Sequence, residues 1–470
     1  MLPAMRSPAP GRVPGRARAV ASAYVLLFAL GVAAYGRLWP QAPVLDGDSA
    51  QYMESAADLQ DGSLDALHFR TPGYPLLLVL TGSAYQPTRA LFYASLLLHF
   101  ASVWLLTVVL HRAGAGPLWR LCLIAVLLLP PYVEPAAYVM TESLAEFVLV
   151  CGFASLVLWH VTRRLPWAVL AGVALSLSAL VRPVYQLLVP AVAAGVMILH
   201  LARLTRTKES PDYNRAAGAM LVAWMVLIGG IASFNQVRFG WVGVAPSAGF
   251  HLSTKTMAFV ERLPDEYAQV REVLIRERDA QLVKRGGTHT GTQAIWSARP
   301  ELERLTGLSG PELSHFLVQM NLALIARAPM QYLEEVARSM ATYWFPATGR
   351  LGGLDITGLR SVWALLHGGL AVLFGAELAV VLGIAMIALT AGRRVRASLM
   401  GAIDFTDLQA FVFALAATIV FYTMVLSCFL DIGEPRHRRP TDALFIAATL
   451  VAAFVWTRTA RTLTASPPAC

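Results

Sequence analysis

A chain of 470 residues in which 56% are hydrophobic and only 14% are charged is too apolar for a soluble globular protein, since soluble domains carry about 25% charged residues. The formal net charge of +9 admits a nucleic-acid-binding protein, but the basic residues lie in short segments between apolar runs rather than along one stripe. That distribution is typical of the positive-inside pattern of membrane proteins. The composition therefore excludes a large soluble core and argues against nucleic acid as a partner.

Cysteine spacing and the common catalytic motifs do not support a redox, metal or nucleotide function. The four cysteines form no Cys-x-x-Cys or Cys/His pattern, so neither a disulfide framework nor a thiolate metal site is predicted. No Walker loop, GxGxxG, HExxH or GxSxG motif occurs, which argues against nucleotide hydrolysis and the common hydrolase mechanisms. We expect no required cofactor and no metal-ligating residues, and the sequence leaves dependence on a divalent metal undecided.

The chain begins with a segment rich in Pro, Arg and Gly, residues 1–19, that is expected to be disordered. The apolar run after it predicts a retained transmembrane helix rather than a signal peptide, because further spans follow and no clear small-residue cleavage site does. Crossing a bilayer takes about 20 apolar residues. The candidate spans, some of them short, are Val20–Leu38, Arg89–Leu110, Leu118–Tyr132, Tyr138–His160, Pro166–Val181, Pro183–Leu204, Ala216–Asn235, Arg360–Ala391, Leu408–Leu430 and Asp442–Thr457.

Basic residues at the turns predict the orientation of these helices. If the Arg-rich N-terminus is cytoplasmic, alternation places further basic turns inside, near Arg112, Arg163, Arg206, Arg393 and Arg458. Both termini are then cytoplasmic, and the polar loop 41–75 lies on the exterior, or periplasmic, face. The long segment 237–356 lies there too, and its helix signals, such as the charged and apolar pattern of Asp265–Lys284, predict a small helical cap.

The sequence therefore predicts an all-α, multi-pass protein of the plasma (inner) membrane, a polytopic bundle of about ten transmembrane helices with a small helical exterior cap. The expected organisation is a disordered basic N-terminus (1–19), an N-terminal transmembrane module (20–236) with its first exterior loop (41–75), an exterior helical domain (237–356), C-terminal transmembrane helices (357–460) and a tail (461–470).

The first exterior loop concentrates ionisable groups beside the bilayer, where such groups are costly and usually functional. Its acids begin with Asp46 and Asp48, and Asp48 shares a helix face with Tyr52, four residues on. A carboxylate there is suited to act as general base on an acceptor hydroxyl or amine. The alternative is that Asp48 only caps and solubilises a short helix. His68 and Tyr74 are further candidates, although a tyrosine here is more often part of an interfacial aromatic belt than catalytic.

Arg70 precedes the rigid turn Thr71-Pro72-Gly73-Tyr74-Pro75. Its guanidinium at the membrane face suits bidentate recognition of a phosphate. The alternative is a contact with lipid headgroups, and the sequence leaves both open.

Two further polar clusters fall on the same predicted face. Glu142 and Glu146 lie one turn apart in an apolar span, where carboxylates face a polar cavity or are paired, and Arg182 is the candidate partner. The turn Gly433–Asp442 carries basic residues on the exterior, against the positive-inside trend: Arg436, His437, Arg438 and Arg439. An anionic phosphate group explains them, with lipid headgroups as the alternative, and Glu434 is placed to orient one of these arginines.

Several motifs in order along the chain resemble the membrane-embedded GT-C glycosyltransferases. The resemblance is strongest to bacterial relatives of protein O-mannosyltransferases and of lipid A aminoarabinose transferase (glycosyltransferase family 39/83-like). The motifs are Asp48-xxx-Tyr52 with Ala56-Ala57, Leu59 and Gly62; Arg70-Thr-Pro-Gly-Tyr-Pro75; Thr141-Glu142-Ser143-Leu144; Leu180-Val-Arg-Pro183; Phe234-Asn235 with Gly240; Gly249-Phe-His-Leu252; Ala328-Pro329-Met-Gln-Tyr332; and Glu434-Pro-Arg436 with Arg439-Pro440.

The resemblance implies a GT-C-like fold and a hexosyl- or pentosyltransferase that uses a polyprenyl-phosphate-linked sugar, works at the periplasmic face and inverts the anomeric carbon. It maps the acceptor-activating acid onto Asp48 and the donor-phosphate contact onto Arg70, with Arg182, Arg436 and Arg439 offsetting charge on the departing phosphate. Relatives often carry an Asp-Glu pair where this chain reads Asp48-Ser49, which leaves Asp46 as an alternative base. The implied partners are the donor, a lipid, glycan or protein acceptor, and membrane lipids.

A transporter or flippase for lipid-linked sugars is the alternative function. It predicts internal repeats and charged or broken helices near mid-membrane, whereas this sequence pattern keeps its charges at one face and adds an exterior domain. The sequence names neither the sugar, the acceptor nor the oligomeric state.

Overall fold

The computed structural model describes residues 14–39, 41–204, 213–284, 294–344, 357–390 and 407–465. Within these ranges the secondary structure is helical, and extended pairing is confined to one isolated bridge between Val44 and Tyr138. The predicted all-α class is confirmed.

Ten apolar helices correspond to the ten predicted spans. They are α1 (Pro14–Leu38), α4 (Arg89–Arg112), α5 (Pro117–Leu127), α7 (Glu142–Thr162), α8 (Leu165–Val181), α9 (Leu188–Leu204), α10 (Tyr213–Phe239), α16 (Thr357–Thr390), α18 (Asp407–Leu430) and α19 (Pro435–Ala465). Among the described residues, six helices are long and apolar enough to cross a bilayer, or seven if α5 is joined to the bent segment Pro130–Ala137 that follows it. The protein is a multi-pass membrane protein, and about ten crossings stays a prediction.

Two boundaries differ from the expected ones. α1 begins at Pro14, inside the segment expected to be disordered, because a proline is tolerated in the first turn of a helix; residues 1–13 lie outside the described residues. The span predicted from Pro183 opens as a short 3₁₀ helix, η3 (Pro183–Leu187), before α9. Pro183 has no backbone N–H, so it cannot donate the hydrogen bond that would continue α8 into the next helix.

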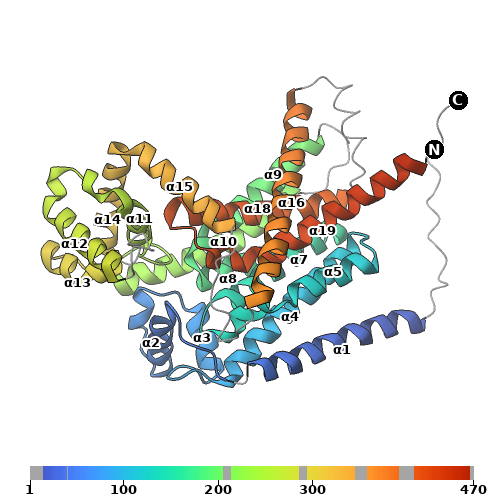
Figure 1. Ribbon diagram of the computed structural model, residues 1–470, viewed down its shortest axis with the longest axis horizontal. Helices are drawn as coiled ribbons and strands as arrows, with labels where there is room; N and C mark the ends of the chain where they lie inside the picture. The colour runs from blue at the N-terminus through green and yellow to red at the C-terminus, as the bar shows by residue number, and fades with distance from the viewer. Residues whose placement is uncertain are drawn as a thin grey trace.

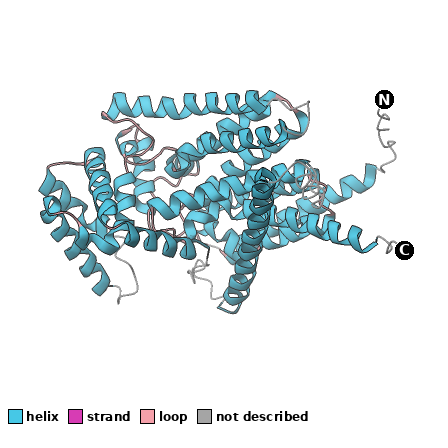
Figure 2. Ribbon diagram, turned by 90° about the horizontal axis from the view of Figure 1, so that it is seen from above, coloured by secondary structure: helices cyan, strands magenta, loops and turns pink. Residues whose placement is uncertain are grey.

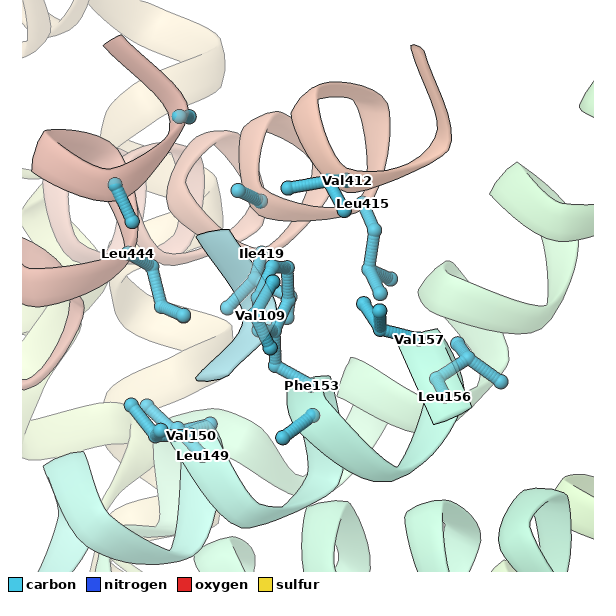
Figure 3. Packing of buried hydrophobic residues seen from close by; sticks show 14 of the residues in the cluster. Val109, Leu149, Val150, Phe153, Leu156, Val157, Val412, Leu415, Ile419 and Leu444 are labelled. Carbon is cyan, nitrogen blue, oxygen red and sulfur yellow. The ribbon is translucent and has the colours of Figure 1, made fainter. Parts of the chain in front are cut away.

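The main core lies where α4, α7, α18 and α19 pack together. Figure 3 shows Val109, Phe153 and Ile419 from three of these helices meeting in its centre. Glycines allow the neighbouring helices to approach closely: a Cβ at Gly152 of α7 would lie 2.6 Å from the Leu175 side chain of α8. Small residues at such contacts are typical of membrane helix packing.

Five helices between α10 and α16 form a second unit, here called the cap. They are α11 (Ala248–Thr256), α12 (Ala268–Lys284), α13 (Ala294–Thr306), α14 (Gly310–Arg327) and α15 (Pro329–Trp344), with the 3₁₀ helices η4 (Met257–Arg262) and η5 (Asp265–Tyr267). Phe250, Leu274, Ile295 and Leu317 belong to a hydrophobic core separate from that of the bundle. The helix predicted at Asp265–Lys284 is η5 followed by α12.

The cap lies at one end of the molecule, together with the helices of the first loop, α2 (Ser49–Gln60) and α3 (Gly73–Leu80) (Figure 1). The start of α1 and the end of α19 lie at the opposite end, and a view from above shows the same separation (Figure 2). Helix α16 runs across the other long helices instead of alongside them in both views. The polar elements are therefore gathered at the end away from the two terminal helix ends.

We expect Gly249→Ala to weaken the packing of α11 against α14 and to lower the stability of the protein. The added Cβ would lie 2.0 Å from the Ser314 carbonyl oxygen. Overpacking of this kind costs about 1–3 kcal/mol. Thermal unfolding in detergent checks the loss. The matched control is Gly218→Ala in α10, where no atom lies within 4 Å of the new Cβ; equal melting temperatures for the two variants would contradict the packing account.

Candidate functional site

The carboxylate of Asp48 points to arginines rather than capping its helix. Asp48 occupies the N-cap position of α2 but makes no side-chain capping hydrogen bond. Instead, Arg70 Nη2 donates to Asp48 Oδ1 at 3.0 Å, and Arg436 Nη1 lies 3.6 Å from Oδ2. The capping role considered as the alternative is therefore not the one that the side chain takes.

Asp46 has a different environment from Asp48. Its side chain is exposed, whereas its backbone N–H donates to Ser49 Oγ at 2.8 Å and its carbonyl oxygen lies 2.7 Å from the same hydroxyl. Ser49 Oγ also lies 2.8 Å from the carbonyl oxygen of Val139, which ties the loop to the bundle. Asp46 thus shapes the turn, and the structure brings Asp48 to the arginines.

Arg70 is held over two buried tyrosines. Its guanidinium lies 4.8 Å from the ring centroid of Tyr52, and its Nε donates to Gln51 Oε1 at 3.0 Å. Tyr52 contacts Tyr74 edge-on at 5.2 Å. Burial raises the pKa of both phenols, so both remain neutral. Tyr74 is buried, so the interpretation as an interfacial belt residue is wrong. Its ring packs against Tyr52, the residue that contacts Arg70.

Two more acid–arginine pairs lie beside Asp48. Arg182 Nη1 donates to Glu142 Oε1 at 3.2 Å, the pairing considered from the sequence. Arg436 Nε lies 2.9 Å from Glu434 Oε2, which confirms that Glu434 contacts one of these arginines, although the atoms are not aligned as a hydrogen bond. Arg436 also interacts electrostatically with Glu142, which links the pairs.

These six side chains form what we call the arginine–carboxylate cluster: Asp48, Arg70, Glu142, Arg182, Glu434 and Arg436. Three positive charges face three negative charges, so the cluster is balanced without a ligand. Burial raises the pKa of Asp48, but the charges of Arg70 and Arg436 outweigh it and leave that pKa below its usual value. Asp48 is therefore ionised, and an anionic ligand would compete with it for the two arginines.

Arg439 pairs outside this cluster, and it lines a small pocket that Glu142 of the cluster also lines. Its Nη2 donates to the buried Glu134 at 2.8 Å. The pocket is lined on its polar side by His99, Tyr132, Glu142, Glu146, Arg439 and Asp442. Glu146 lies 3.1 Å from Nδ1 of His99, in the middle of α4. The expectation that ionisable groups stay at one face is wrong here, because buried pairs balance their charges inside the bundle.

The basic residues in the first turns of α19 have different environments. Arg436 joins the cluster, whereas Arg438 is 1% exposed and bonds Asp442 Oδ1 at 2.6 Å and the Tyr343 carbonyl. The interpretation that an exterior phosphate explains Arg438 is wrong, since the residue is enclosed between α15 and α19. His437 is also buried, 3.8 Å from Asp431. His68 falls in the 3₁₀ helix η1 (Asp65–His68), and its side chain lies outside the described residues.

The sequence interpretation missed one conspicuous pair. His251 of α11 lies 2.9 Å from Asp431, in the turn between α18 and α19, although 180 residues separate them. The Gly249-Phe-His-Leu252 motif contained the histidine, but nothing in its spacing points to Asp431. Among the described residues, no group of three or more His, Cys, Asp or Glu is placed to hold a metal ion.

No protein-family model matches the chain, and no curated protein matches it in sequence. Solved structures similar to it include the archaeal oligosaccharyltransferase AglB from Archaeoglobus fulgidus, in complex with an inhibitory peptide and a dolichol-phosphate (TM-score 0.48, 14% identity, 95% of this chain and 52% of that chain). ArnT from Cupriavidus metallidurans bound to undecaprenyl phosphate is also similar (TM-score 0.39, 13% identity, 93% and 78%). The chain spans about half the length of AglB. The chemistry of the site therefore rests on its own geometry.

Proposed function

We propose that the protein is a glycosyltransferase that moves a sugar from a polyprenyl-phosphate carrier to a cell-envelope acceptor, with inversion at the anomeric carbon. The observation that carries the proposal is the position of Asp48 between Arg70 and Arg436. The carboxylate can bind an acceptor nucleophile, and the two guanidinium groups can bind a phosphate leaving group beside it.

The arginines supply the electrostatic part of the reaction. As the bond between the sugar and the phosphate breaks, negative charge builds on the departing polyprenyl phosphate. Arg70, Arg182 and Arg436 are fixed by their acid partners, and fixed cations stabilise such charge without reorganising during the reaction. Arg439 is paired with Glu134 in the neighbouring pocket. In this proposal it holds the structure of that pocket and does not contact the phosphate.

Asp48 serves the acceptor. When the donor phosphate pairs with Arg70 and Arg436, the two charges that depress the pKa of Asp48 are neutralised. The freed carboxylate then accepts a hydrogen bond from the acceptor hydroxyl or amine and holds it against the anomeric carbon. This order, donor first and acceptor second, follows from the competition between phosphate and carboxylate for the same arginines.

We place the reaction at the exterior face, with both termini in the cytoplasm. The separation of the cap, α2 and α3 from the start of α1 and the end of α19 supports this orientation (Figure 1), as do the basic turns. In this scheme 237–356 is the exterior domain, the lipid tail lies among the helices of the bundle, and no metal is needed. The sugar and the acceptor are left open.

Arg70→Ala is expected to weaken donor binding. Hydrogen bonds to charged groups contribute about 1.5–3 kcal/mol, so the Kd for polyprenyl phosphate in nanodiscs should rise about tenfold to a hundredfold. Arg112→Ala, at the exposed end of α4, is the matched control and should leave the Kd unchanged. An unaltered Kd in Arg70→Ala would exclude Arg70 as a phosphate contact.

A further inference from the structure

The strongest feature outside the arginine–carboxylate cluster is the pair formed by His251 and Asp431. The histidine side chain is 41% exposed, and the carboxylate behind it is 17% exposed. His251 Nδ1 lies 2.9 Å from Asp431 Oδ2. An accessible imidazole backed by a largely buried carboxylate is the arrangement that orients a histidine for proton transfer in hydrolytic triads.

Asp431 is held as an ionised acceptor. Its Oδ1 accepts hydrogen bonds from Thr254 Oγ1 at 3.0 Å and from the backbone N–H of Ile432 at 2.8 Å. Burial raises the pKa of this carboxyl, but the charge and hydrogen bond of His251 and the charge of His437 outweigh it, so the pKa lies below its usual value. An ionised carboxylate has no proton to donate, so His251 Nδ1 must carry the hydrogen, and in the neutral imidazole the lone pair is then on Nε2.

The surrounding backbone fixes this geometry on both sides. Gly433, two residues after Asp431, has φ +64°, and a Cβ there would lie 2.7 Å from the Ser339 carbonyl oxygen. On the other side, Gly249 seats α11 against Ser314 of α14, and Trp296 contacts the imidazole edge-on at 5.9 Å. Both partners therefore lie on backbone that packs closely against a cap helix, Asp431 near α15 and His251 near α14.

The pair also lies within electrostatic range of the arginine–carboxylate cluster. The charge of His251 acts on Asp48, and His437 interacts with His251, Asp431 and Arg436. Asp48 is engaged by two arginines until the donor phosphate takes its place, and its freed carboxylate is then occupied by the hydrogen bond from the acceptor. A separate proton acceptor beside the cluster allows Asp48 to keep that positioning role.

We propose that His251 is the general base of the transfer, oriented by Asp431, and that Asp48 positions the acceptor. This rests on the proposed glycosyltransferase function. With a hydroxyl acceptor, the O–H proton passes to His251 Nε2 as the acceptor oxygen forms its bond to the anomeric carbon. The bond from that carbon to the phosphate oxygen breaks, its electron pair leaves with the polyprenyl phosphate, and the imidazolium, stabilised by Asp431, later releases its proton to water.

The test compares His251→Gln with His315→Gln, a change of an exposed histidine on α14. Transfer from a synthetic polyprenyl-phosphate sugar is measured with purified full-length protein in nanodiscs, with an envelope fraction as the acceptor source. General base catalysis contributes about 10²–10⁴-fold, so kcat in His251→Gln should fall by that factor, with unchanged Kd for polyprenyl phosphate and unchanged thermal unfolding. His315→Gln should match the wild type.

The pH profile and chemical rescue separate catalysis from structure. General base catalysis predicts that the activity of the wild type falls toward acid pH, and this acidic limb should vanish in His251→Gln. The titratable groups around the imidazole are Asp431 and His437 from the α18–α19 region, Lys255 on its own helix and Asp48 from the first loop. Imidazole added to His251→Ala should restore part of the lost rate.

The outcomes are distinguishable. Wild-type activity and pH profile in His251→Gln would overturn the assignment of the base and leave the glycosyltransferase function standing. A rate loss in His251→Gln with a retained acidic limb and no rescue of His251→Ala would also overturn it, since that is the behaviour of a structural residue. Absence of transfer by the wild-type protein would contradict the function itself, and this assignment with it.

Discussion

Asp48→Asn is expected to abolish sugar transfer while leaving expression and folding intact. The substitution removes the charge that balances Arg70 and Arg436 and replaces a two-oxygen acceptor by an amide with one acceptor oxygen. We expect kcat to fall at least about a hundredfold, the range in which misplacing one catalytic contact costs activity. The measurement is transfer from a polyprenyl-phosphate sugar by variant and wild type at equal amounts of folded protein.

Asp46→Asn is the matched control for this result. Asp46 is exposed and takes part through its backbone, so its variant should keep wild-type transfer. The comparison decides which of the two carboxylates is required for sugar transfer, a choice that the sequence left open. Full activity in Asp48→Asn, or loss in Asp46→Asn alone, would sink the assignment of Asp48.

Arg438→Met is expected to produce the largest loss of stability. Arg438 is fully enclosed and joins Asp442 of its own helix to the end of α15 through the Tyr343 carbonyl. Removing one partner of a buried ion pair leaves an uncompensated charge and costs about 3–5 kcal/mol. Unfolding in detergent, followed by circular dichroism against temperature or denaturant, measures the change.

Arg112→Met serves as the control, because Arg112 lies exposed at the end of α4. The double variant Arg438→Met with Asp442→Leu should recover much of the loss, since removing both charges also removes the unpaired one. Equal stability of Arg438→Met and the wild type would show that the pair is not a structural link between α15 and α19.

The apolar segments were predictable because each is a local pattern. Length and hydropathy alone locate the apolar spans, whereas a pattern of charged and apolar residues locates α12 of the cap. Pairings between distant segments were harder. Glu142 with Arg182 could be considered because both flank one predicted face, and the structure joins them at 3.2 Å.

His251 with Asp431 and His99 with Glu146 could not be predicted, because helix packing, not spacing, brings them together. The roles of the arginines at the start of α19 could not be predicted either. Arg436 and Arg438 look equivalent in the sequence, yet two positions along α19 turn one toward Asp48 and the other into the space beneath α15. Charge counts at a turn therefore do not separate ligand contacts from buried structural pairs.

Buried ionisable groups inside the bundle are the feature of the structure that a flippase would share. His99 with Glu146, and Glu377 in α16, are buried ionisable groups inside apolar helices, a feature expected of transporters. A transporter moves the lipid-linked sugar unchanged, whereas a transferase cleaves it from its carrier. The two functions therefore differ in the fate of one bond.

That bond gives the most direct test. The purified protein is reconstituted in liposomes with a polyprenyl-phosphate sugar labelled in the sugar and with an envelope acceptor fraction, and the lipid products are followed by mass spectrometry. Our account predicts protein-dependent appearance of free polyprenyl phosphate and of label on the acceptor, both lost in Asp48→Asn. A carrier that crosses the bilayer with its sugar still attached, and no labelled acceptor, would contradict it.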